Sequence, residues 1–308
     1  MKLQQLRYAL EVYRHNLNVS EAADALFTSQ PGISKQIRLL EEELGIQIFI
    51  RSGKRVVSVS QPGKAVLEIS ERILRDVQNI KNIGSEFTDH DSGSLTIATT
   101  HTQARYALPK IVAEFVKNYP KVNLTIKQGS PSAIAQMVSS GEADLAIITE
   151  RIDDHPELGK LPCYEWNHAV IVPHDHPLLD CRNPLSLEDL ASFPLVTYEF
   201  AFNSGSSIAR TFNKAHIEQP DVALSAADTD VLKTYVRLGL GVGLMAKMAY
   251  DPVVDQDLQL IDAAHLFEPS PTWIALRTDT YLRGYTYDFI QMFAPKLTRE
   301  AVDRILYT

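Results

Sequence analysis

Polar and cationic side chains recur at helical spacing near residue 30 of the chain. They lie three or four positions apart, as residues on one face of a helix do. They are Gln30, Ser34, Lys35 and Arg38. Amide, hydroxyl and guanidinium groups near the start of such a helix can hydrogen bond to base edges and phosphates in a major groove. A solvated face of a structural helix has the same composition, so the stripe alone does not decide.

Three cations follow in the expected turn of a β-hairpin. Residues 47–51 and 56–59 have the composition of two short strands around Ser52 and Gly53. A basic hairpin tip directly after a helix of this kind is typical of the wing of a winged helix-turn-helix, where it contacts phosphates. The candidate DNA-binding residues are Thr28, Ser29, Gln30, Pro31, Ser34, Lys35, Arg38, Arg51, Lys54 and Arg55.

A second polar segment, Thr99-Thr100-His101-Thr102-Gln103, lies between an expected strand and an expected helix. Its hydroxyl and amide groups, together with the free N–H groups of the helix start, favour a small anion. Ordinary helix capping by Thr100 or Thr102 explains the same residues, and the motif alone does not separate the two interpretations.

Charge divides unevenly along the chain, whose net charge is −8. Residues 1–64 carry nine Lys and Arg against six Asp and Glu, a charge of +3, whereas the remainder carries 21 against 32, a charge of −11. A basic N-terminal part on an acidic body favours a chain in which only the N-terminal part approaches phosphates.

Three helices and one long helix are expected in the basic part, over 3–14, 20–26, 30–44 and from Ser60 onward. Their inner positions are expected at Leu6, Leu10, Val12 and Tyr13 in the first helix, and at Ile33, Ile37, Leu40 and Leu44 in the third. The long helix repeats apolar residues at steps of three and four from Val66 to Ile83, which favours pairing with the same helix of a second copy. Packing against its own domain is the alternative.

Strands and helices alternate from residue 94 onward. Short apolar runs suited to buried parallel strands occur in two groups and are followed by one last strand. They cover 95–98, 122–126 and 145–148, then 169–172, 195–197, 222–225 and 242–245, and finally 273–277. Helices are expected near 102–118, 131–140, 186–191, 205–215, 228–238, 280–293 and 298–307. The pattern predicts two α/β lobes with a ligand cleft outside the strand ends.

The chain resembles the LysR-type transcriptional regulators over essentially its whole length. The segments that carry the resemblance are Ala22-Ala23, Thr28 to Ile37 and Leu40 to Gly45 in the basic part. Ala98 to Pro109, Gln128 to Pro131, Leu161 to Tyr164, Trp166, Asp228 to Gly243 and Tyr287 to Gln291 resemble the cysteine-regulon activator branch.

The resemblance implies an α/β fold with a DNA-binding domain at 1–60, a linker and dimerisation helix at 61–92 and an effector domain at 93–308. The effector domain is expected to have the two-lobed, periplasmic-binding-protein-like (type II) fold, with lobe I at 93–162 and 268–308 and lobe II at 163–267. The implied partners are promoter DNA, RNA polymerase and further copies of the chain in a homotetramer.

The resemblance also implies the effector and its contacts. Acetylserine, sulfate, thiosulfate or a related anion is expected in the cleft between the lobes. The matching positions are Thr100, Thr102, Gln103, Thr149, Trp166 and Asn203. Asn203 replaces a threonine of the branch, and glycine at position 205 replaces an arginine, so the exact effector stays open. Control of cysteine synthesis is the first expectation, and control of sulfonate or sulfate-ester use is the alternative.

Other classes of function have little support. We expect no cofactor and no metal: His174-Asp175-His176 lies between two prolines without a further ligand at suitable spacing. No motif of an enzyme is present, and a small-molecule-binding protein without a DNA role would not need the basic part. The chain has no long apolar run and opens without an apolar signal core, so we expect no membrane contact and a cytoplasmic location. Cys163 and Cys181 are expected as two buried thiols, with a redox-sensing pair as the alternative.

Overall fold

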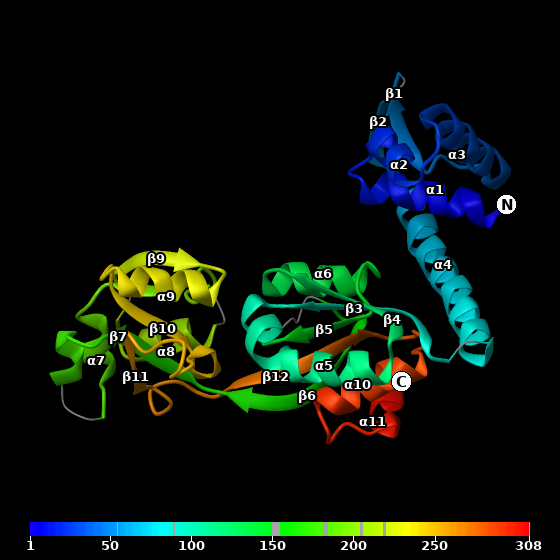
Figure 1. Ribbon diagram of the computed structural model, residues 1–308. Helices are drawn as coiled ribbons and strands as arrows, with labels where there is room; N and C mark the ends of the chain where they lie inside the picture. The colour runs from blue at the N-terminus through cyan, green and yellow to red at the C-terminus, as the bar shows by residue number, and fades with distance from the viewer. Residues whose placement is uncertain are drawn as a thin grey trace. The chain divides into compact units, whose positions relative to one another are not determined.

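The structure, a computed structural model, describes residues 1–53, 55–88, 90–149, 155–180, 184–203, 206–217 and 220–307. The chain divides into two units, Met1–Thr88 and Asp89–Thr308. Figure 1 shows that the first unit consists of helices and one hairpin, whereas the second contains two β-sheets flanked by helices.

The first unit, which we call the head, begins with three helices. They are α1 (Leu3–Arg14), α2 (Val19–Ala25) and α3 (Gln30–Leu44). The side chain of Asn18 accepts hydrogen bonds from the first turn of α2 and caps that helix. Gly45 ends α3 with φ 67°, a conformation that glycine adopts without the steric cost of a Cβ. The three predicted helices are confirmed, α2 beginning one residue earlier than expected.

The core of the head is built from the predicted apolar faces. Ile33, Ile37 and Leu40 of α3 are buried together with side chains of α1 and α2. Two expected core residues are wrong: Tyr13 is 51% exposed and Leu44 is 39% exposed. Each lies in the last turn of its helix, where the packed face ends.

A hairpin and a long helix complete the head. They are β1 (Phe49–Ser52), β2 (Arg55–Val59) and α4 (Gln61–Thr88). Gly63 of α4 lies so close to the hairpin that a Cβ there would come within 2.1 Å of the carbonyl oxygen of Ile48. Of the predicted seam on α4, Val66 and Ile73 pack against the core of the head itself, whereas Ile69, Ile80 and Ile83 are exposed in the single chain.

The second unit contains two five-stranded sheets. The sheet of the first lobe has the order β4-β3-β5-β12-β6. Its strands are β3 (Ser92–Thr99), β4 (Lys121–Gln128), β5 (Leu145–Ile148), β6 (Leu158–Trp166) and β12 (Ser270–Arg277). The helical segments of this lobe are η1 (Gln103–Ala107), α5 (Leu108–Asn118), α6 (Pro131–Ser139), α10 (Gly284–Phe293) and α11 (Arg299–Leu306).

The sheet of the second lobe has the order β11-β7-β10-β8-β9. Its strands are β7 (His168–Pro173), β8 (Leu195–Tyr198), β9 (Val222–Ala226), β10 (Val242–Ala246) and β11 (Leu258–Asp262). The helical segments are η2 (Pro177–Asp180), α7 (Leu187–Ala191), α8 (Ser207–Lys214), α9 (Thr229–Arg237) and η3 (Lys247–Ala249). Each sheet has its own hydrophobic core.

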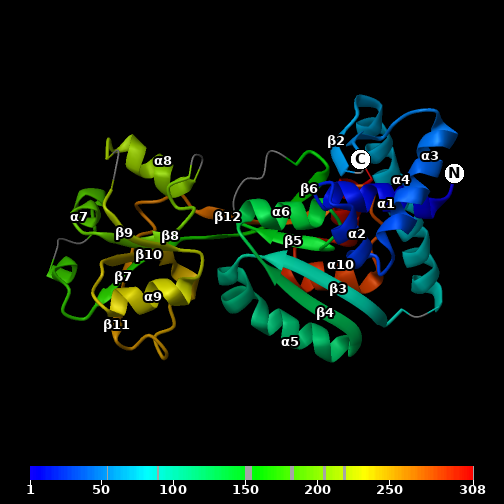
Figure 2. The same cartoon turned by 90° about the horizontal axis from the view of Figure 1, so that it is seen from above.

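The chain passes between the lobes twice, and Figure 2 shows the two lobes side by side. On the outward passage β6 ends at Trp166 in the first sheet and β7 begins at His168 in the second. On the return, β11 ends at Asp262 and β12 begins at Ser270. The first sheet therefore extends four residues beyond the predicted lobe boundary at 162.

Both sheets are mixed rather than parallel throughout. Strand β3 runs parallel to β4 and β5, as expected, but β12 pairs antiparallel with β5 and β6. Strand β7 likewise pairs antiparallel with β10 and β11, so the parallel prediction for 169–172 is wrong. The antiparallel strands are those that enter or leave a lobe, because a passage between lobes does not need the helical crossover that parallel neighbours require.

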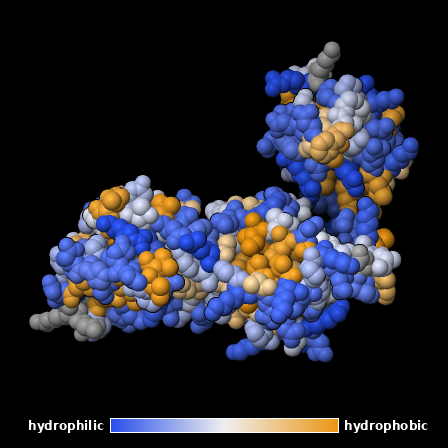
Figure 3. Space-filling view, viewed as in Figure 1, coloured by the Kyte–Doolittle hydropathy of each residue, from blue (hydrophilic) through white to orange (hydrophobic). Residues whose placement is uncertain are grey.

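None of the helices in the described part of the chain is long and apolar enough to cross a membrane. Figure 3 shows a largely hydrophilic face with separate hydrophobic patches.

Candidate nucleic-acid interface and ligand pocket

The polar stripe of α3 lies on the surface of the head. Gln30, Lys35 and Arg38 are exposed and Ser34 is partly exposed, whereas the apolar stripe is buried on the opposite side. The hydroxyl of Ser29 accepts a hydrogen bond from the backbone N–H of Gly32 at 3.3 Å and caps the helix. Of the other predicted contacts here, Ser29 and Pro31 are exposed and Thr28 is partly exposed. The whole stripe is therefore accessible to a DNA duplex.

The hairpin is fixed to α3 by a buried carboxylate that no sequence pattern indicated. One oxygen of Glu41, a residue only 7% exposed, accepts hydrogen bonds from the backbone N–H groups of Ile48 and Phe49 at 2.9 and 3.0 Å. Its other oxygen accepts a 2.7 Å hydrogen bond from Arg51. Glu41 thus sets the position of the hairpin relative to the helix. In the sequence, nothing distinguishes Glu41 from its acidic neighbours Glu42 and Glu43, so this role could not be predicted.

The three hairpin cations have different surroundings. Arg51 is half-buried by its ion pair with Glu41, so part of its charge is used inside the head. Arg55, at the start of β2, is exposed. Lys54 lies outside the described residues. Of the hairpin cations that the structure describes, Arg55 is therefore the one that is fully available for contact with phosphate.

In the second unit, the predicted anion segment follows β3 and contacts the second lobe. The hydroxyl of Thr102 lies 2.9 Å from that of Thr229 at the start of α9 and 3.4 Å from that of Tyr198 at the end of β8. The side chain of Gln103 accepts a hydrogen bond from Tyr164 at 2.5 Å and lies 3.9 Å from the sulfur of Met248. Thr100 is buried. The side chains of Thr102 and Gln103 therefore already have protein partners.

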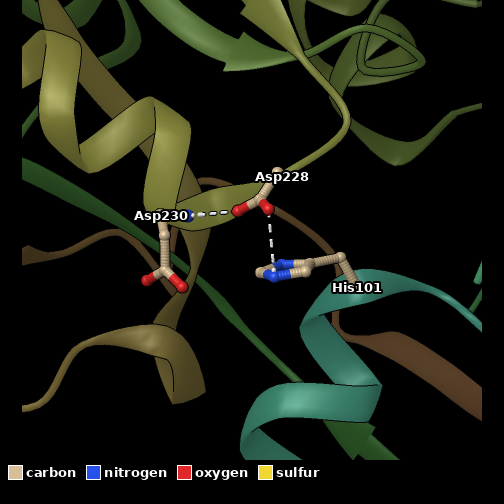
Figure 4. A group of neighbouring side chains, drawn as sticks. All are labelled: His101, Asp228 and Asp230. Carbon is tan, nitrogen blue, oxygen red and sulfur yellow. Dashed lines mark hydrogen bonds and ion pairs between the residues drawn. The ribbon is translucent and has the colours of Figure 1, made fainter.

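Further polar and charged contacts join residues 101–106 to the start of α9, and Figure 4 shows the contact between His101 and Asp228. Nε2 of His101 lies 3.1 Å from a carboxylate oxygen of Asp228. The carboxylate of Asp230 lies 2.5 Å from Nε of Arg105 and accepts a 2.6 Å hydrogen bond from Tyr106. Burial and the bond to Asp230 raise the pKa of the Tyr106 hydroxyl, so it remains a donor.

One atom each of His101, Asp228 and Asp230 lie within 4.8 Å of one another, a spacing that a metal ion could use. Asp228, however, accepts hydrogen bonds from the backbone N–H groups of Asp230 and Val231 and so caps α9. Asp230 is held by Arg105 and Tyr106. We therefore interpret the cluster as a contact between the lobes.

His174 and His176, which sequence spacing alone could suggest as metal ligands, also have protein partners. Nε2 of His174 lies 2.6 Å from the carbonyl oxygen of Gln256, and Nδ1 of His176 accepts a hydrogen bond from the N–H of Leu178 at 3.1 Å.

Burial raises the pKa of the Cys163 thiol to about 12, which keeps it protonated and unreactive. Cys181 lies outside the described residues, so the predicted thiol pair stays untested.

A pocket of about 250 Å³ opens where the two lobes meet. Thr149 at the end of β5 and Trp166 at the end of β6, both predicted effector contacts, line it. Thr100, Thr102, Gln103 and Asn203 are not among its lining residues. Thr102 is joined to the pocket through Tyr198, which lines the pocket and bonds to Thr102.

Asn203 lies in the turn between β8 and α8. Its backbone N–H donates to the carbonyl of Phe200 at 3.1 Å, and its own carbonyl accepts from the N–H of Ser206 at 3.1 Å. The neighbouring position 205, where the sequence lacks the arginine of the branch, lies outside the described residues. The structure therefore places Asn203 beside the pocket wall formed by Phe200, Ala201 and Ser206.

Further polar residues line the pocket, and no sequence pattern indicated them. They are Glu165, His168, Ser206, Ser207, Arg210 and Glu268. His168 is 3% exposed, and burial lowers the pKa of its imidazole to about 4, so the ring is uncharged at neutral pH. Arg210 and Glu268 approach each other at 3.5 Å. Sequence spacing does not reveal this set, because the two passages between the lobes and the turn before α8 bring it together.

The geometry defines a class of protein: a winged helix-turn-helix head with an accessible polar helix, joined in one chain to a two-lobed domain with a pocket between the lobes. Such a chain has an exposed surface suited to DNA and a separate pocket suited to a small ligand. Residues 3–64 match the family model described as bacterial regulatory helix-turn-helix protein, lysR family, and residues 88–298 match the LysR substrate binding domain.

Individual relatives agree with both matches. The HTH-type transcriptional regulator SsuR of Burkholderia cenocepacia is 50% identical over 306 residues, which cover 99% of this chain and 99% of that protein. The regulator CysB of the same organism is 50% identical over 306 residues, 99% of this chain and 97% of that protein. The crystal structure of the cofactor-binding domain of the Cbl transcriptional regulator is similar with a TM-score of 0.65 and 39% identity, and the match covers 70% of this chain and 95% of that chain.

The chain belongs to the LysR family of transcriptional regulators. It is a DNA-binding regulator with an effector domain and not an enzyme, as the sequence predicted. The predicted resemblance to the cysteine-regulon activator branch is confirmed by the 50% sequence identity to CysB.

Proposed function

We propose that the protein regulates genes of sulfur assimilation and cysteine biosynthesis in response to a small effector bound between its lobes. The effector is acetylserine or a sulfate-like anion, and the protein acts in the cytoplasm on promoter DNA, together with RNA polymerase. The observation that carries the proposal is the combination in one chain of an accessible polar stripe on α3 and a pocket lined by Thr149 and Trp166.

Assembly into a dimer of dimers is part of the proposal. Ile69, Ile80 and Ile83 on α4 are 48%, 68% and 39% exposed in the single chain. Isolated exposed apolar residues are ordinary, but a row of them at helical spacing favours pairing with a second helix. Two heads held by paired α4 helices read two half-sites, so the expected target is an interrupted inverted repeat.

The exposure of the polar stripe on α3 supports a proposed set of DNA contacts. Gln30, Ser34, Lys35 and Arg38 on α3 are proposed to enter the major groove, and Thr28, Ser29 and Pro31 are proposed to contact the adjacent backbone. Arg51, Lys54 and Arg55 of the hairpin are proposed to contact phosphates.

The effector contacts are proposed in the other unit. They are Thr100, Thr102, Gln103, Thr149, Trp166 and Asn203, of which Thr149 and Trp166 line the pocket.

A selection of binding sites from random duplexes tests the DNA-binding part. The full chain is expected to enrich a two-fold symmetric sequence, and Gln30→Ala is expected to lose about 1–3 kcal/mol of discrimination against a changed base. Glu42→Ala, at the far end of the same face of α3, removes no base-contacting group and should keep the discrimination. Equal losses on specific and random DNA for Gln30→Ala would remove this residue from the base-reading set.

Control of sulfonate or sulfate-ester use is the second candidate. The chain is as similar to SsuR as to CysB, at 50% identity over 306 residues in both cases. Sequencing of the genomic DNA that the protein binds in cells separates the two candidates. Sites at cysteine-synthesis genes support the first, and sites confined to sulfonate-uptake genes support the second.

A further inference from the structure

The pocket between the lobes contains a mixed set of charges. Among its described lining residues, Arg210 of α8 is the one Lys or Arg side chain, and Glu165 and Glu268 are the acidic ones. The guanidinium of Arg210 lies 3.5 Å from the carboxylate of Glu268, and the two side chains are 47% and 64% exposed. An ion pair with this exposure contributes little to stability, so a ligand carboxylate can replace Glu268 at low cost.

A second observation points to a ligand in the same pocket. The indole nitrogen of Trp166 is buried and has no hydrogen-bond partner among the described residues. An indole N–H can only donate, and an unsatisfied buried donor costs about 1–3 kcal/mol. A bound acceptor would remove this cost. Burial keeps the neighbouring His168 imidazole uncharged at neutral pH, so it adds no cation to the lining.

The volume of the pocket indicates the size of the ligand. About 250 Å³ exceeds the roughly 150 Å³ of a cavity that binds a molecule the size of benzene. A tetrahedral oxyanion alone leaves much of this space empty, whereas a small organic acid with one further polar group fills it. The lining offers such a ligand a cation at Arg210 and uncharged hydrogen-bonding groups at Thr149, Ser206 and Ser207.

We infer that Arg210 is a specificity-determining residue of the effector pocket, where it binds the carboxylate of a small acylated amino acid in exchange for Glu268. The inference rests on the proposed effector function and deepens it. A guanidinium matches a carboxylate with two parallel N–H···O bonds, so Arg210 favours a carboxylic acid over the uncharged amide of the same shape.

Lys214 provides a matched control on the same helix. It also pairs with Glu268, at 3.3 Å, and lies one helical turn beyond Arg210, but it is not among the lining residues of the pocket. Lys214→Gln therefore removes the same charge and the same ion-pair partner without removing a group that lines the pocket. The three exposed side chains can be changed with little risk to the fold.

The test is calorimetric titration of the full chain with N-acetylserine and with its uncharged carboxamide, N-acetylserinamide. We expect Arg210→Gln to weaken N-acetylserine binding about tenfold or more and to abolish the preference of the acid over the amide. Glu268→Gln should strengthen N-acetylserine binding, because the competing carboxylate is gone. Lys214→Gln should change both affinities by less than about twofold.

Three results would overturn the inference. Equal weakening by Arg210→Gln and Lys214→Gln would show only a long-range effect of charge. A retained preference for the acid in Arg210→Gln would place the carboxylate elsewhere. If the wild-type chain binds neither compound, the proposed acetylserine effector fails and the inference fails with it, whereas either of the first two results leaves the proposed function intact.

Discussion

The head and the effector domain build their binding surfaces in opposite ways. In the head, the predicted DNA contacts come from one stretch, Thr28 to Arg55, and those on α3 lie on the side of the helix opposite its buried core. In the effector domain, the pocket is lined by residues from Thr149 to Pro271, contributed by both lobes. A helical repeat and a hairpin turn are local properties of the sequence, so the DNA-binding surface could be predicted from them. The pocket depends on how strands from the two lobes meet, so it could not.

The two regions also differ in what holds their functional groups. A single buried carboxylate, Glu41, fixes the hairpin to α3. In the second lobe, Lys233 and Asp255 form an ion pair at 2.6 Å and are 3% and 1% exposed. Lys233 also donates to Tyr106 of the first lobe at 3.2 Å. The effector domain thus contains a buried network of charged side chains, whereas in the head a single carboxylate fixes the hairpin to α3.

Removal of Asp255 is expected to have the largest effect on stability. Although burial opposes it, hydrogen bonds from the Asp251 N–H, Lys233 and Arg237 lower the pKa of this carboxyl and keep it charged. Asp255→Ala leaves two cations without their shared partner and should cost about 3–5 kcal/mol in the unfolding of the effector domain. Urea denaturation measures this loss.

Asp257→Ala is the control for this prediction. Asp257 pairs with Arg237 at 2.7 Å but is 57% exposed, so its removal should cost less than about 1 kcal/mol. Similar losses for the two variants would mean that the buried network does not stabilise the domain as we describe.

Glu41→Ala tests the anchor in the head. The change leaves two buried backbone N–H groups without an acceptor and should cost about 2–4 kcal/mol. We also expect a large loss of DNA affinity, because the hairpin is no longer fixed to α3. Glu42→Ala, at an exposed position next to it, should change stability by less than about 0.5 kcal/mol. If the Glu41 variant melts at the wild-type temperature, the anchor assignment is incorrect.

Acid should destabilise the effector domain through His168. Burial places the pKa of this imidazole near 4 in the folded state, below the ordinary value of 6.5. The unfolded chain therefore takes up a proton first as the pH falls, and stability decreases by about 1.4 kcal/mol per pH unit between about 6.5 and 4. Denaturation at several pH values checks this slope, which should be much smaller in His168→Phe. It should be only slightly smaller in His176→Phe, because burial also lowers the pKa of that imidazole, which is only partly buried.

The smallest expected effect is that of a single hairpin cation. Arg55→Ala should weaken binding to all duplexes alike and reduce the slope of log K against log salt by about 0.9. Anisotropy titrations of specific and random duplexes at several salt concentrations measure it. A loss confined to the specific duplex would show that Arg55 reads sequence.

The sequence predicted the three helices, the hairpin, the long helix and most strands within a few residues. It missed β6 and β11, because Leu158–Trp166 contains a proline and polar residues and Leu258–Asp262 lies at the edge of its sheet. It also predicted one continuous helix where η1 forms a π-helical turn before α5. Pro109 follows directly, and it lacks the N–H that would continue the α-helical bonding through this turn.

The effector site was only partly predictable. Thr149 and Trp166 line the pocket, but Thr102 bonds to the second lobe, and Gln103 bonds to Tyr164 of its own lobe and lies next to Met248 of the second. Arg210 and Glu268 are 58 positions apart in the sequence and meet because the chain returns to the first lobe next to α8. Such pairs depend on where strands cross between lobes, which no local pattern encodes.

The most direct test of the account is the affinity of the full chain for its selected duplex, measured over a range of salt concentrations with and without saturating N-acetylserine. We expect a linear fall of log K with log salt, and a change in affinity or footprint when the effector is present at each salt concentration. A salt-independent affinity would contradict the proposed phosphate contacts of the head, and identical affinity and footprint with and without bound effector would contradict the coupling of the head to the pocket.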